Sequence, residues 1–338
     1  MSRKMPPSAI STNIDFNADG VQHGFLKLPY SSDQSAWGAV MIPITIVKNG
    51  TGQTALLTGG NHGDEYEGII SLQKLSNTLK QKHITGRVII IPMMNHPAVA
   101  AGSRVSPIDG GNMNRAFPGH PQGSITGKIA DYFNRVLIPM CDAALDIHSG
   151  GKTLDILPFA AAHRLPDKLQ ELRCWEGARL FGAPYYFFME EMDAVSLYDT
   201  AVEKQGKVFV TTELGGGGTT TPETVALADR GIHNFLVYSG ILQRNYIDPP
   251  ADPKPMEIPS AKCYLQSEHR GVMEITVKLG QVVVKGDLIA SIHSVERTGQ
   301  SPKKYYATTE GIICAVRHQS LINIGDTFAV IAKPLLTG

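Results

Sequence analysis

The chain has 338 residues, of which 42% are hydrophobic and 18% are charged, a composition typical of a globular protein and not of a largely disordered chain. Its length exceeds that of one ordinary domain and predicts two units, one large and one small. The 31 basic residues balance 31 acidic ones, so the net charge indicates neither a nucleic acid nor a membrane surface as a partner, and a small molecule is expected.

Strand and helix patterns alternate in the first third of the chain. Apolar residues recur with a period of two in residues 37–47, which predicts a strand, and Pro43 favours an edge position for it. The apolar run 55–57, the helical spacing of apolar residues over 69–79 and the apolar run 88–91 indicate a strand, a helix and a second strand. Such a βαβ unit predicts a parallel sheet.

The same alternation continues after an irregular segment. This segment, residues 92–119, is rich in proline and glycine and is too long for a simple connection, as is common for functional loops. Helices are predicted over residues 125–138, 168–180 and 223–242, and strands over residues 143–148 and 208–210.

The residue pattern changes in the C-terminal part of the chain. Residues 248–255 are dense in proline, which is typical of a stiff linker between domains. Beyond them short strands and turns predominate, and residues 277–287 are weakly similar to residues 319–326. We therefore predict a larger domain over residues 1–252 and a small β domain over residues 253–338.

Histidines and acidic residues mark the ends of three predicted strands. His62 and Glu65 follow the first of these strands, His148 ends the second, and Glu213 follows the third. Open α/β sheets place their ligands at this edge. Two imidazoles and a carboxylate form a ligand set that leaves one zinc position open for water, as in catalytic sites. We expect one Zn²⁺ per chain on His62, Glu65 and His148, with Glu213 as the base that accepts the proton of the activated water.

None of these signals is specific alone. A His-x-x-Glu pair is common by chance, a histidine at a strand end is more often an ordinary polar residue, and Glu213 before four glycines is compatible with a turn. Their joint placement favours a metal site. Asp146 precedes His148 by two residues and is expected to form a hydrogen bond beside the metal ligands.

The irregular segment carries two arginines, Arg104 and Arg115, the second directly after Asn114. Arginine can hold a carboxylate through two parallel hydrogen bonds and can polarise a carbonyl oxygen. Either residue alone is compatible with a solvated surface position. Two of them between the metal-ligand candidates indicate an anionic substrate.

Four motifs in this order, residues 59–65, 114–115, 146–148 and 213–215, resemble the succinylglutamate desuccinylase/aspartoacylase family of zinc carboxypeptidase-like amidohydrolases. The resemblance extends over about residues 37–338. It implies an α/β fold with a mixed, mostly parallel sheet flanked by helices. It also implies roles for individual residues: zinc on His62, Glu65 and His148, Glu213 as the general base, Arg104 as the carbonyl polariser, and Asn114 with Arg115 on the substrate carboxylate.

The N-terminal stretches 19–30 and 35–38 are similar to one branch of this family, which deacetylates Nα-acetyl-L-2,4-diaminobutyrate in bacterial ectoine breakdown. This similarity implies an Nα-acetyl amino acid as substrate, with an amine on its side chain. A carboxylate should face that amine, and the candidates are Glu190, Glu191 and Asp193.

The C-terminal domain resembles the barrel-sandwich folds of biotinyl and lipoyl carriers. Lys303 and Lys304 lack the hairpin context of a modified carrier lysine, so we interpret this domain as structural, with a place at the mouth of the site.

The sequence is compatible with several other functions. As an enzyme, the protein could instead be a desuccinylase or aspartoacylase acting on a more acidic substrate, or a carboxypeptidase. A metal-free binding module is the alternative that is not an enzyme. Four scattered cysteines without a Cys-x-x-Cys pair, and the lack of a signal peptide or a membrane-spanning stretch, favour a cytoplasmic protein. The sequence leaves open whether the chain forms a homo-oligomer.

Overall fold

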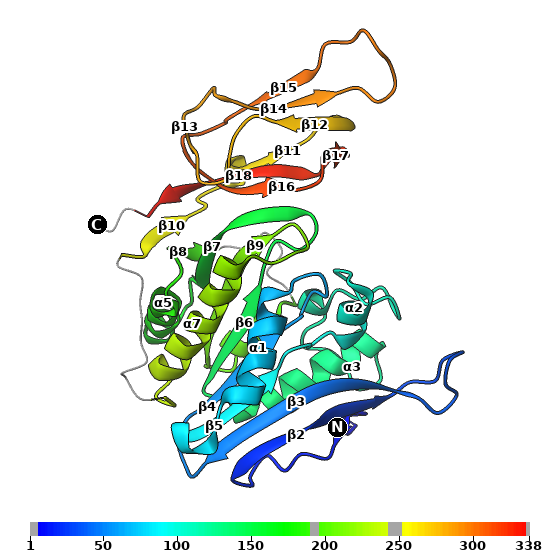
Figure 1. Ribbon diagram of the computed structural model, residues 1–338, viewed down its shortest axis with the longest axis vertical. Coiled ribbons are helices and arrows are strands. Elements are labelled where there is room, and N and C mark those ends of the chain that lie inside the picture. The colour runs from blue at the N-terminus through cyan, green and yellow to red at the C-terminus, as the bar shows by residue number, and fades with distance from the viewer. Residues whose placement is uncertain (1–5, 190–195, 243–251, 336–338) are drawn as a thin grey trace.

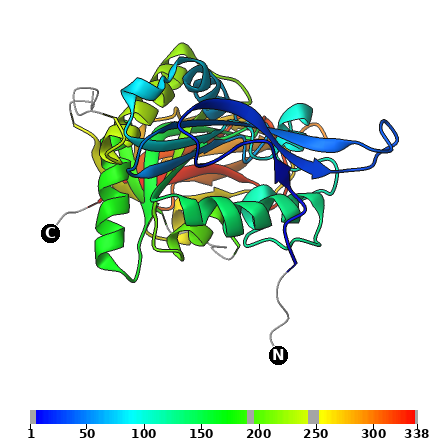
Figure 2. The same ribbon diagram turned by 90° about the horizontal axis from the view of Figure 1, so that it is seen from below.

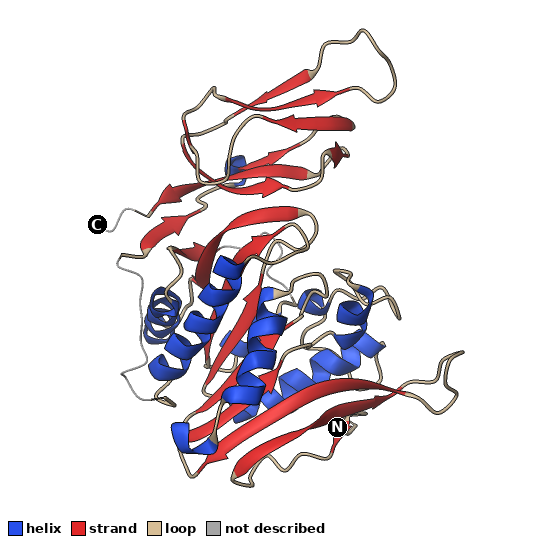
Figure 3. Cartoon of the chain, viewed as in Figure 1, coloured by secondary structure: helices blue, strands red, loops and turns tan. Residues whose placement is uncertain are grey.

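The computed structural model describes residues 6–189, 196–242 and 252–335 (Figure 1). These residues form a mixed α/β fold, with helices beside a long sheet and a group of short strands gathered at one end (Figure 3). None of the helices in these three ranges is long and apolar enough to cross a membrane.

The strands of the described residues are β1 (Ser11–Thr12), β2 (Gly20–Pro29), β3 (Ala39–Asn49), β4 (Thr54–Gly59), β5 (Gly86–Ile91), β6 (Ala143–His148), β7 (Leu154–His163), β8 (Tyr185–Met189), β9 (Val208–Gly216), β10 (Lys254–Glu257), β11 (Tyr264–Gln266), β12 (Gly271–Ile275), β13 (Val282–Val283), β14 (Leu288–His293), β15 (Lys303–Tyr306), β16 (Gly311–Arg317), β17 (Leu321–Ile322) and β18 (Thr327–Pro334). The helices are α1 (Glu67–Thr78), α2 (His96–Ala101), α3 (Ile125–Tyr132), α4 (Ile138–Met140), α5 (Lys168–Phe181), α6 (Tyr198–Glu203) and α7 (Pro222–Tyr238), with short 3₁₀ turns η1 (Gln81–His83), η2 (Met113–Arg115) and η5 (Ala261–Cys263) and a π-helical turn η3 (Phe133–Leu137).

The main sheet has the strand order β1-β2-β3-β5-β4-β6-β9-β7-β8-β10-β18-β16-β13. Its centre, β5-β4-β6-β9, is parallel, as the βαβ pattern predicts. Strands β7, β8 and β10 are parallel to one another but antiparallel to β9. The pairings at both ends of the sheet are antiparallel, so the sheet is mixed, and parallel pairing is found within β5-β4-β6-β9 and within β7-β8-β10.

The predicted edge position of the strand containing Pro43 is wrong. Strand β3 lies between β2 and β5. Its pairing with β5 covers only Thr45–Asn49, whereas Pro43 lies before this region and is paired with Phe25 of β2. Proline therefore occupies a part of β3 that has one neighbour, where its missing N–H leaves no ladder bond unmade.

Two hydrophobic cores lie on opposite faces of the sheet. Alternate residues of β4 divide between them: Ala55 and Leu57 pack in the core under α1, α5 and α7, and Leu56 packs in the core under α3, as the period of two in a strand requires. Figure 2 shows α3 on the opposite face from α1 and α7. The continuous apolar run that predicts this strand reflects burial on both faces.

Several predicted boundaries change. The helix predicted over 125–138 consists of three consecutive segments of different helix type, α3, η3 and α4, and the helix predicted over 223–242 ends at Tyr238. Strand β9 extends to Gly216, so that Glu213 lies within the strand and not after it. Strands β7 and β8 and the short helices α2 and α6 have no counterpart among the predicted elements.

Several C-terminal strands pair with strands of the main sheet. Strand β10 pairs with β8 on one side and β18 on the other, and β16 pairs with β7. Strands β15-β14-β12-β17 form a second sheet, which shares a core with β16 and β18. The predicted linker lies outside the described residues up to position 251, and the division of the chain at 252 stays a prediction.

Candidate active site

The loop between β4 and α1 carries His62 and Glu65, and a glycine fixes its path. The Gly63 N–H donates to the Ser103 carbonyl oxygen at 2.9 Å. A Cβ on Gly63 would lie 2.0 Å from the carbonyl carbon of Ala98, at the start of the last turn of α2. The loop backbone thus lies directly against α2, which only glycine permits at this position.

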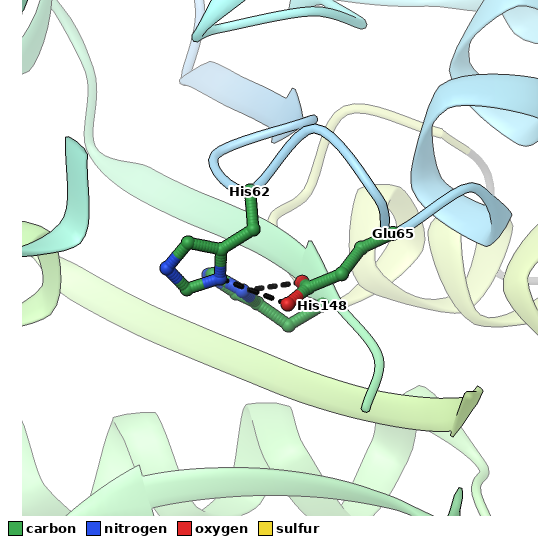
Figure 4. A group of neighbouring side chains, drawn as sticks. All are labelled: His62, Glu65 and His148. Carbon is green, nitrogen blue, oxygen red and sulfur yellow. Dashed lines mark hydrogen bonds and ion pairs between the residues drawn. The ribbon is translucent and has the colours of Figure 1, made fainter. Parts of the chain in front are cut away.

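Three buried side chains converge at the carboxyl ends of β4 and β6 (Figure 4). His62 Nδ1 lies 2.8 Å from Glu65 Oε1, and His148 Nδ1 lies 2.8 Å from Glu65 Oε2. One ligand atom from each residue falls within 4.8 Å of the other two. The structure therefore brings His62, Glu65 and His148 together as a group that can hold one metal ion.

The outer nitrogen of each histidine is occupied by an acceptor. His62 Nε2 lies 3.2 Å from Asn112 Oδ1, which also accepts the backbone N–H of Asn114 at 3.1 Å. His148 Nε2 lies 2.7 Å from Asp146 Oδ2. Acceptors at both Nε2 atoms favour protons there, and each Nδ1 is left to face Glu65.

Asp146 is itself held by two donors. Its Oδ1 accepts the Thr58 hydroxyl at 2.6 Å and its Oδ2 accepts the Asn61 amide at 2.9 Å. Burial acts to raise the pKa of Asp146, but His148 and these two donors outweigh it and hold the pKa below its ordinary value. The carboxylate beside His148 is consequently charged at neutral pH.

The electrostatics of the three-residue group favour a cation. Burial acts to raise the pKa of Glu65, but the imidazoles of His62 and His148 outweigh it and hold the pKa well below its ordinary value. Burial lowers the pKa of His62. Burial also opposes a charge on His148, yet Asp146 and Glu65 raise its pKa well above the usual range. Both carboxylates thus favour positive charge here, which a divalent ion held by nitrogen and oxygen donors supplies, and the donor set fits zinc.

A pocket of ≈ 240 Å³ opens over this group. Eight residues that the sequence singles out line it, together with five others. Its described lining residues are His62, Glu65, Arg104, Asn114, Arg115, Asp146, His148, Met189, Asp199, Phe209, Thr211, Glu213 and Tyr264.

The two arginines approach the pocket from the segment after α2. Arg104 Nη1 lies 3.2 Å from His62 Nδ1 and 3.4 Å from Glu65 Oε1, and the side chain is 49% exposed. Arg115 Nη1 donates to the Asn114 carbonyl oxygen at 3.1 Å, and the Asn114 side chain accepts the Tyr198 N–H at 3.2 Å. One guanidinium is therefore beside the metal-ligand group, and the other is on the loop anchored to α6.

Five lining residues were not singled out from the sequence: Met189, Asp199, Phe209, Thr211 and Tyr264. Asp199 lies on a six-residue helix with no apolar periodicity, and Tyr264 comes from the C-terminal strands. No local pattern in the sequence marks either residue. The candidates Glu190, Glu191 and Asp193 lie outside the described residues.

Comparison with known proteins gives the family of this chain. Residues 51–239 match the succinylglutamate desuccinylase/aspartoacylase catalytic domain. The chain therefore belongs to this family of amide hydrolases. It is 59% identical over 327 residues to the N-alpha-acetyl-L-2,4-diaminobutyric acid deacetylase of Halomonas elongata. The aligned region covers 97% of this chain and 96% of that protein.

Solved structures agree with this assignment. A succinylglutamate desuccinylase from Silicibacter sp. TM1040 is 52% identical with a TM-score of 0.94, covering 98% of this chain and 100% of that chain. The product-bound ectoine utilization protein EutE (DoeB) from Ruegeria pomeroyi is 50% identical with a TM-score of 0.94, covering 97% of this chain and 99% of that chain.

Proposed function

We propose that this chain is a zinc-dependent amidohydrolase that deacetylates Nα-acetyl-L-2,4-diaminobutyrate in ectoine degradation. The observation that carries the proposal is the convergence of His62, Glu65 and His148 in a pocket that also contains Glu213 and arginine side chains. The similarity to the Halomonas elongata deacetylase along nearly the whole chain supports the choice of acyl group and amino acid.

The metal would be held by His62, Glu65 and His148. Zinc in such a site supplies a Lewis acid that polarises the amide carbonyl and acidifies a water molecule. Asn112 and Asp146 orient the two imidazoles through their Nε2 atoms, so that the Nδ1 lone pairs are directed into the group.

Side chains of the protein carry out the proton transfer, stabilise the developing charge and hold the substrate. Glu213 accepts a proton from the attacking water and delivers it to the amide nitrogen as the C–N bond breaks, giving acetate and the free α-amine. Arg104 lies beside the ligand group and is placed to stabilise the charge that develops on the carbonyl oxygen. Arg115 and Asn114 hold the α-carboxylate of the substrate.

A desuccinylase is the second candidate, because a relative that is 52% identical carries that description. The four carboxylates of the described lining residues, Glu65, Asp146, Asp199 and Glu213, are balanced by Arg104, Arg115 and a divalent ion, so the net charge of the pocket does not choose between the two substrates. The deacetylase is favoured by the 59% identity to the Halomonas elongata enzyme over nearly the whole chain.

We further propose that the chain divides near residue 252 and that the C-terminal unit helps to shape the mouth of the site. Tyr264 of β11 lines the pocket. The pairings of β16 with β7 and of β10 with β8 attach this unit to strands that border the pocket.

The experiment that tests the function combines metal analysis with product release. Protein purified without chelator should contain about one zinc per chain and release acetate from Nα-acetyl-L-2,4-diaminobutyrate, with Nα-acetyl-L-aspartate and N-succinyl-L-glutamate as comparison substrates. Zinc with preferential succinate release would establish the second candidate instead. Protein that binds no zinc and hydrolyses none of the three substrates would contradict both.

A further inference from the structure

Asp199 is a buried carboxylate in the wall of the pocket over the metal-ligand group. Asp199 is the second residue of α6 and is 4% exposed. It lines the same pocket as His62 and Glu213. A carboxylate in the wall of a binding pocket can hold a cationic group of a ligand through charge-assisted hydrogen bonds.

The start of α6 is tied to the residues proposed to bind the substrate carboxylate. The N–H of Tyr198, directly before Asp199, donates to Asn114 Oδ1 at 3.2 Å. In diaminobutyrate the side-chain nitrogen is separated from Cα by only two methylene groups. A group that recognises this nitrogen must consequently lie near the group that holds the α-carboxylate, as Asp199 does.

Neighbouring residues hold the Asp199 carboxylate in place. Its Oδ1 accepts the N–H of Thr200 and the Thr200 hydroxyl, the latter at 3.1 Å. Its Oδ2 lies 3.8 Å from His163 Nε2, and His163 Nδ1 lies 3.0 Å from Glu203 Oε1. Asp199 and Glu203 of α6 thus flank one imidazole, that of His163 in β7.

The other carboxylates of the described pocket wall have functions already. Glu65 belongs to the metal-ligand group, Asp146 accepts hydrogen bonds from His148, Thr58 and Asn61, and Glu213 is the proposed base. Among the acidic residues of the described pocket wall, Asp199 is the one that takes no part in the metal-ligand group, its hydrogen bonds or the proposed proton transfer.

We infer that Asp199 binds the side-chain ammonium group of the substrate and thereby selects amino acids that carry an amine. The inference rests on the proposed deacetylase function and names the residue behind its substrate preference. Glu190, Glu191 and Asp193 lie outside the described residues and stay candidates for the same contact. His163 and Glu203 act as positioning residues behind Asp199.

The test compares two substrates of the same shape. Nα-acetyl-L-norvaline differs from Nα-acetyl-L-2,4-diaminobutyrate by a methyl group in place of the ammonium group. Asp199→Asn should lower kcat/KM for the diaminobutyrate amide about 10- to 100-fold, as expected when a hydrogen bond between charged groups is lost, and should change the norvaline value little. Equal losses for both substrates, or no loss for either, would overturn the inference, because a purely structural role does not distinguish them.

A matched control measures the effect of losing a buried aspartate elsewhere. Asp131 is also buried, and its carboxylate accepts hydrogen bonds from Arg135 at 2.6 Å on α3, outside the pocket. Asp131→Asn should leave the ratio of kcat/KM for the two substrates at the wild-type value. A changed ratio in this variant would mean that the ratio reports stability and would remove the support for Asp199.

A second variant covers the case in which Asp199→Asn does not fold. Asp199→Glu keeps the charge and extends it by one methylene group, so the preference should shift from the diaminobutyrate amide towards the shorter Nα-acetyl-L-2,3-diaminopropionate. An unchanged order of the two substrates would contradict the inference. Wild-type protein that hydrolyses none of these amides would refute the proposed function itself, and the inference with it; active wild type with unaltered preferences in the variants refutes the inference alone.

Discussion

His148 and Glu213 are paired residues on adjacent parallel strands, β6 and β9. Side chains at paired positions project from the same face of a sheet, so the register of two strands presents a metal-ligand candidate and the proposed base to one pocket. Glu213 is not part of the group formed by His62, Glu65 and His148. The base and the ligands can therefore be separated by mutation.

Glu213→Gln should lower kcat for acetate release by about 10²- to 10⁴-fold, the range typical of general acid–base catalysis, and should leave zinc content unchanged. Stopped-time acetate assays and metal analysis of the same preparation measure the two quantities. Glu223→Gln, at an exposed position in the first turn of α7, is the control and should match wild type. Near-normal turnover in Glu213→Gln would refute its role as the base.

Asp146→Asn should weaken zinc binding about 10- to 100-fold, as is typical when the hydrogen-bond partner of a metal-binding histidine is altered. The reason is the 2.7 Å contact between Asp146 Oδ2 and His148 Nε2, which orients the imidazole. Competition with a chromogenic chelator gives the affinity. Asp142→Asn, just before the other end of β6, removes a carboxylate that accepts the Thr54 N–H at 2.8 Å and should leave zinc affinity intact; equal effects from both changes would indicate general damage to β6.

The residues at strand ends were predictable because two local patterns coincide there. Apolar runs mark β4 and β6, and polar residues with metal-binding side chains follow or end them. The same patterns do not reveal β7, where the run Phe159–Ala162 contains three alanines, a residue type depleted in strands. Its place in the sheet is decided by pairing with β8, β9 and β16, which is a tertiary effect.

The pocket residues that escaped prediction depend on contacts between distant segments. Tyr264 reaches the site because β11 pairs with β18, far along the chain, and Asp199 because the turn before it is anchored by Asn114. Neither arrangement leaves a periodic signature in the sequence. The helix-spacing rules that locate α1 and α5 require longer segments than the six residues of α6.

Gly63→Ala should destabilise the protein by about 1–3 kcal/mol, the cost typical of overpacking, and should weaken zinc binding. The added Cβ would meet the backbone of Ala98, 2.0 Å away, and would displace the loop that carries His62. Urea unfolding and chelator competition measure the two effects. Gly127→Ala in α3 is the control, since its Cβ would meet only Ser124 Oγ at 3.6 Å, and alanine is favoured over glycine within helices. Wild-type stability and zinc affinity in Gly63→Ala would contradict the close packing.

The cysteines should be unreactive in the folded protein. All four are free thiols and are buried. Burial raises the pKa of Cys141 and of Cys314 to about 12, and that of Cys174 to about 11, so very little reactive thiolate is present at pH 8. A thiol-specific dye should label no cysteine of native protein within minutes and should label all four in denaturant. Rapid labelling of one native thiol would show that its burial is incomplete.

Asp109 should stabilise the loop that carries the arginines in a pH-dependent way. Its carboxylate accepts the Thr126 N–H and the Thr126 hydroxyl, each at 2.7 Å, and the Gly111 N–H at 3.1 Å, and so joins the segment before Asn112 to α3. Partial burial acts to raise the pKa of Asp109, but these hydrogen bonds outweigh it and hold the pKa below its ordinary value. Replacement by asparagine should cost about 1 kcal/mol at neutral pH.

The pH dependence follows from the direction of this shift. Because the pKa of Asp109 is lower in the folded than in the unfolded chain, its contribution is complete above about pH 4, the ordinary value for aspartate, and is lost as the pH falls through the folded value. The difference in unfolding free energy between wild type and Asp109→Asn should thus stay constant from neutral pH down to about pH 5 and shrink below about pH 4. Asp33→Asn, at an exposed position, should show no such trend. A difference that grows on acidification would reverse the sign of the linkage and would contradict the hydrogen bonding of Asp109.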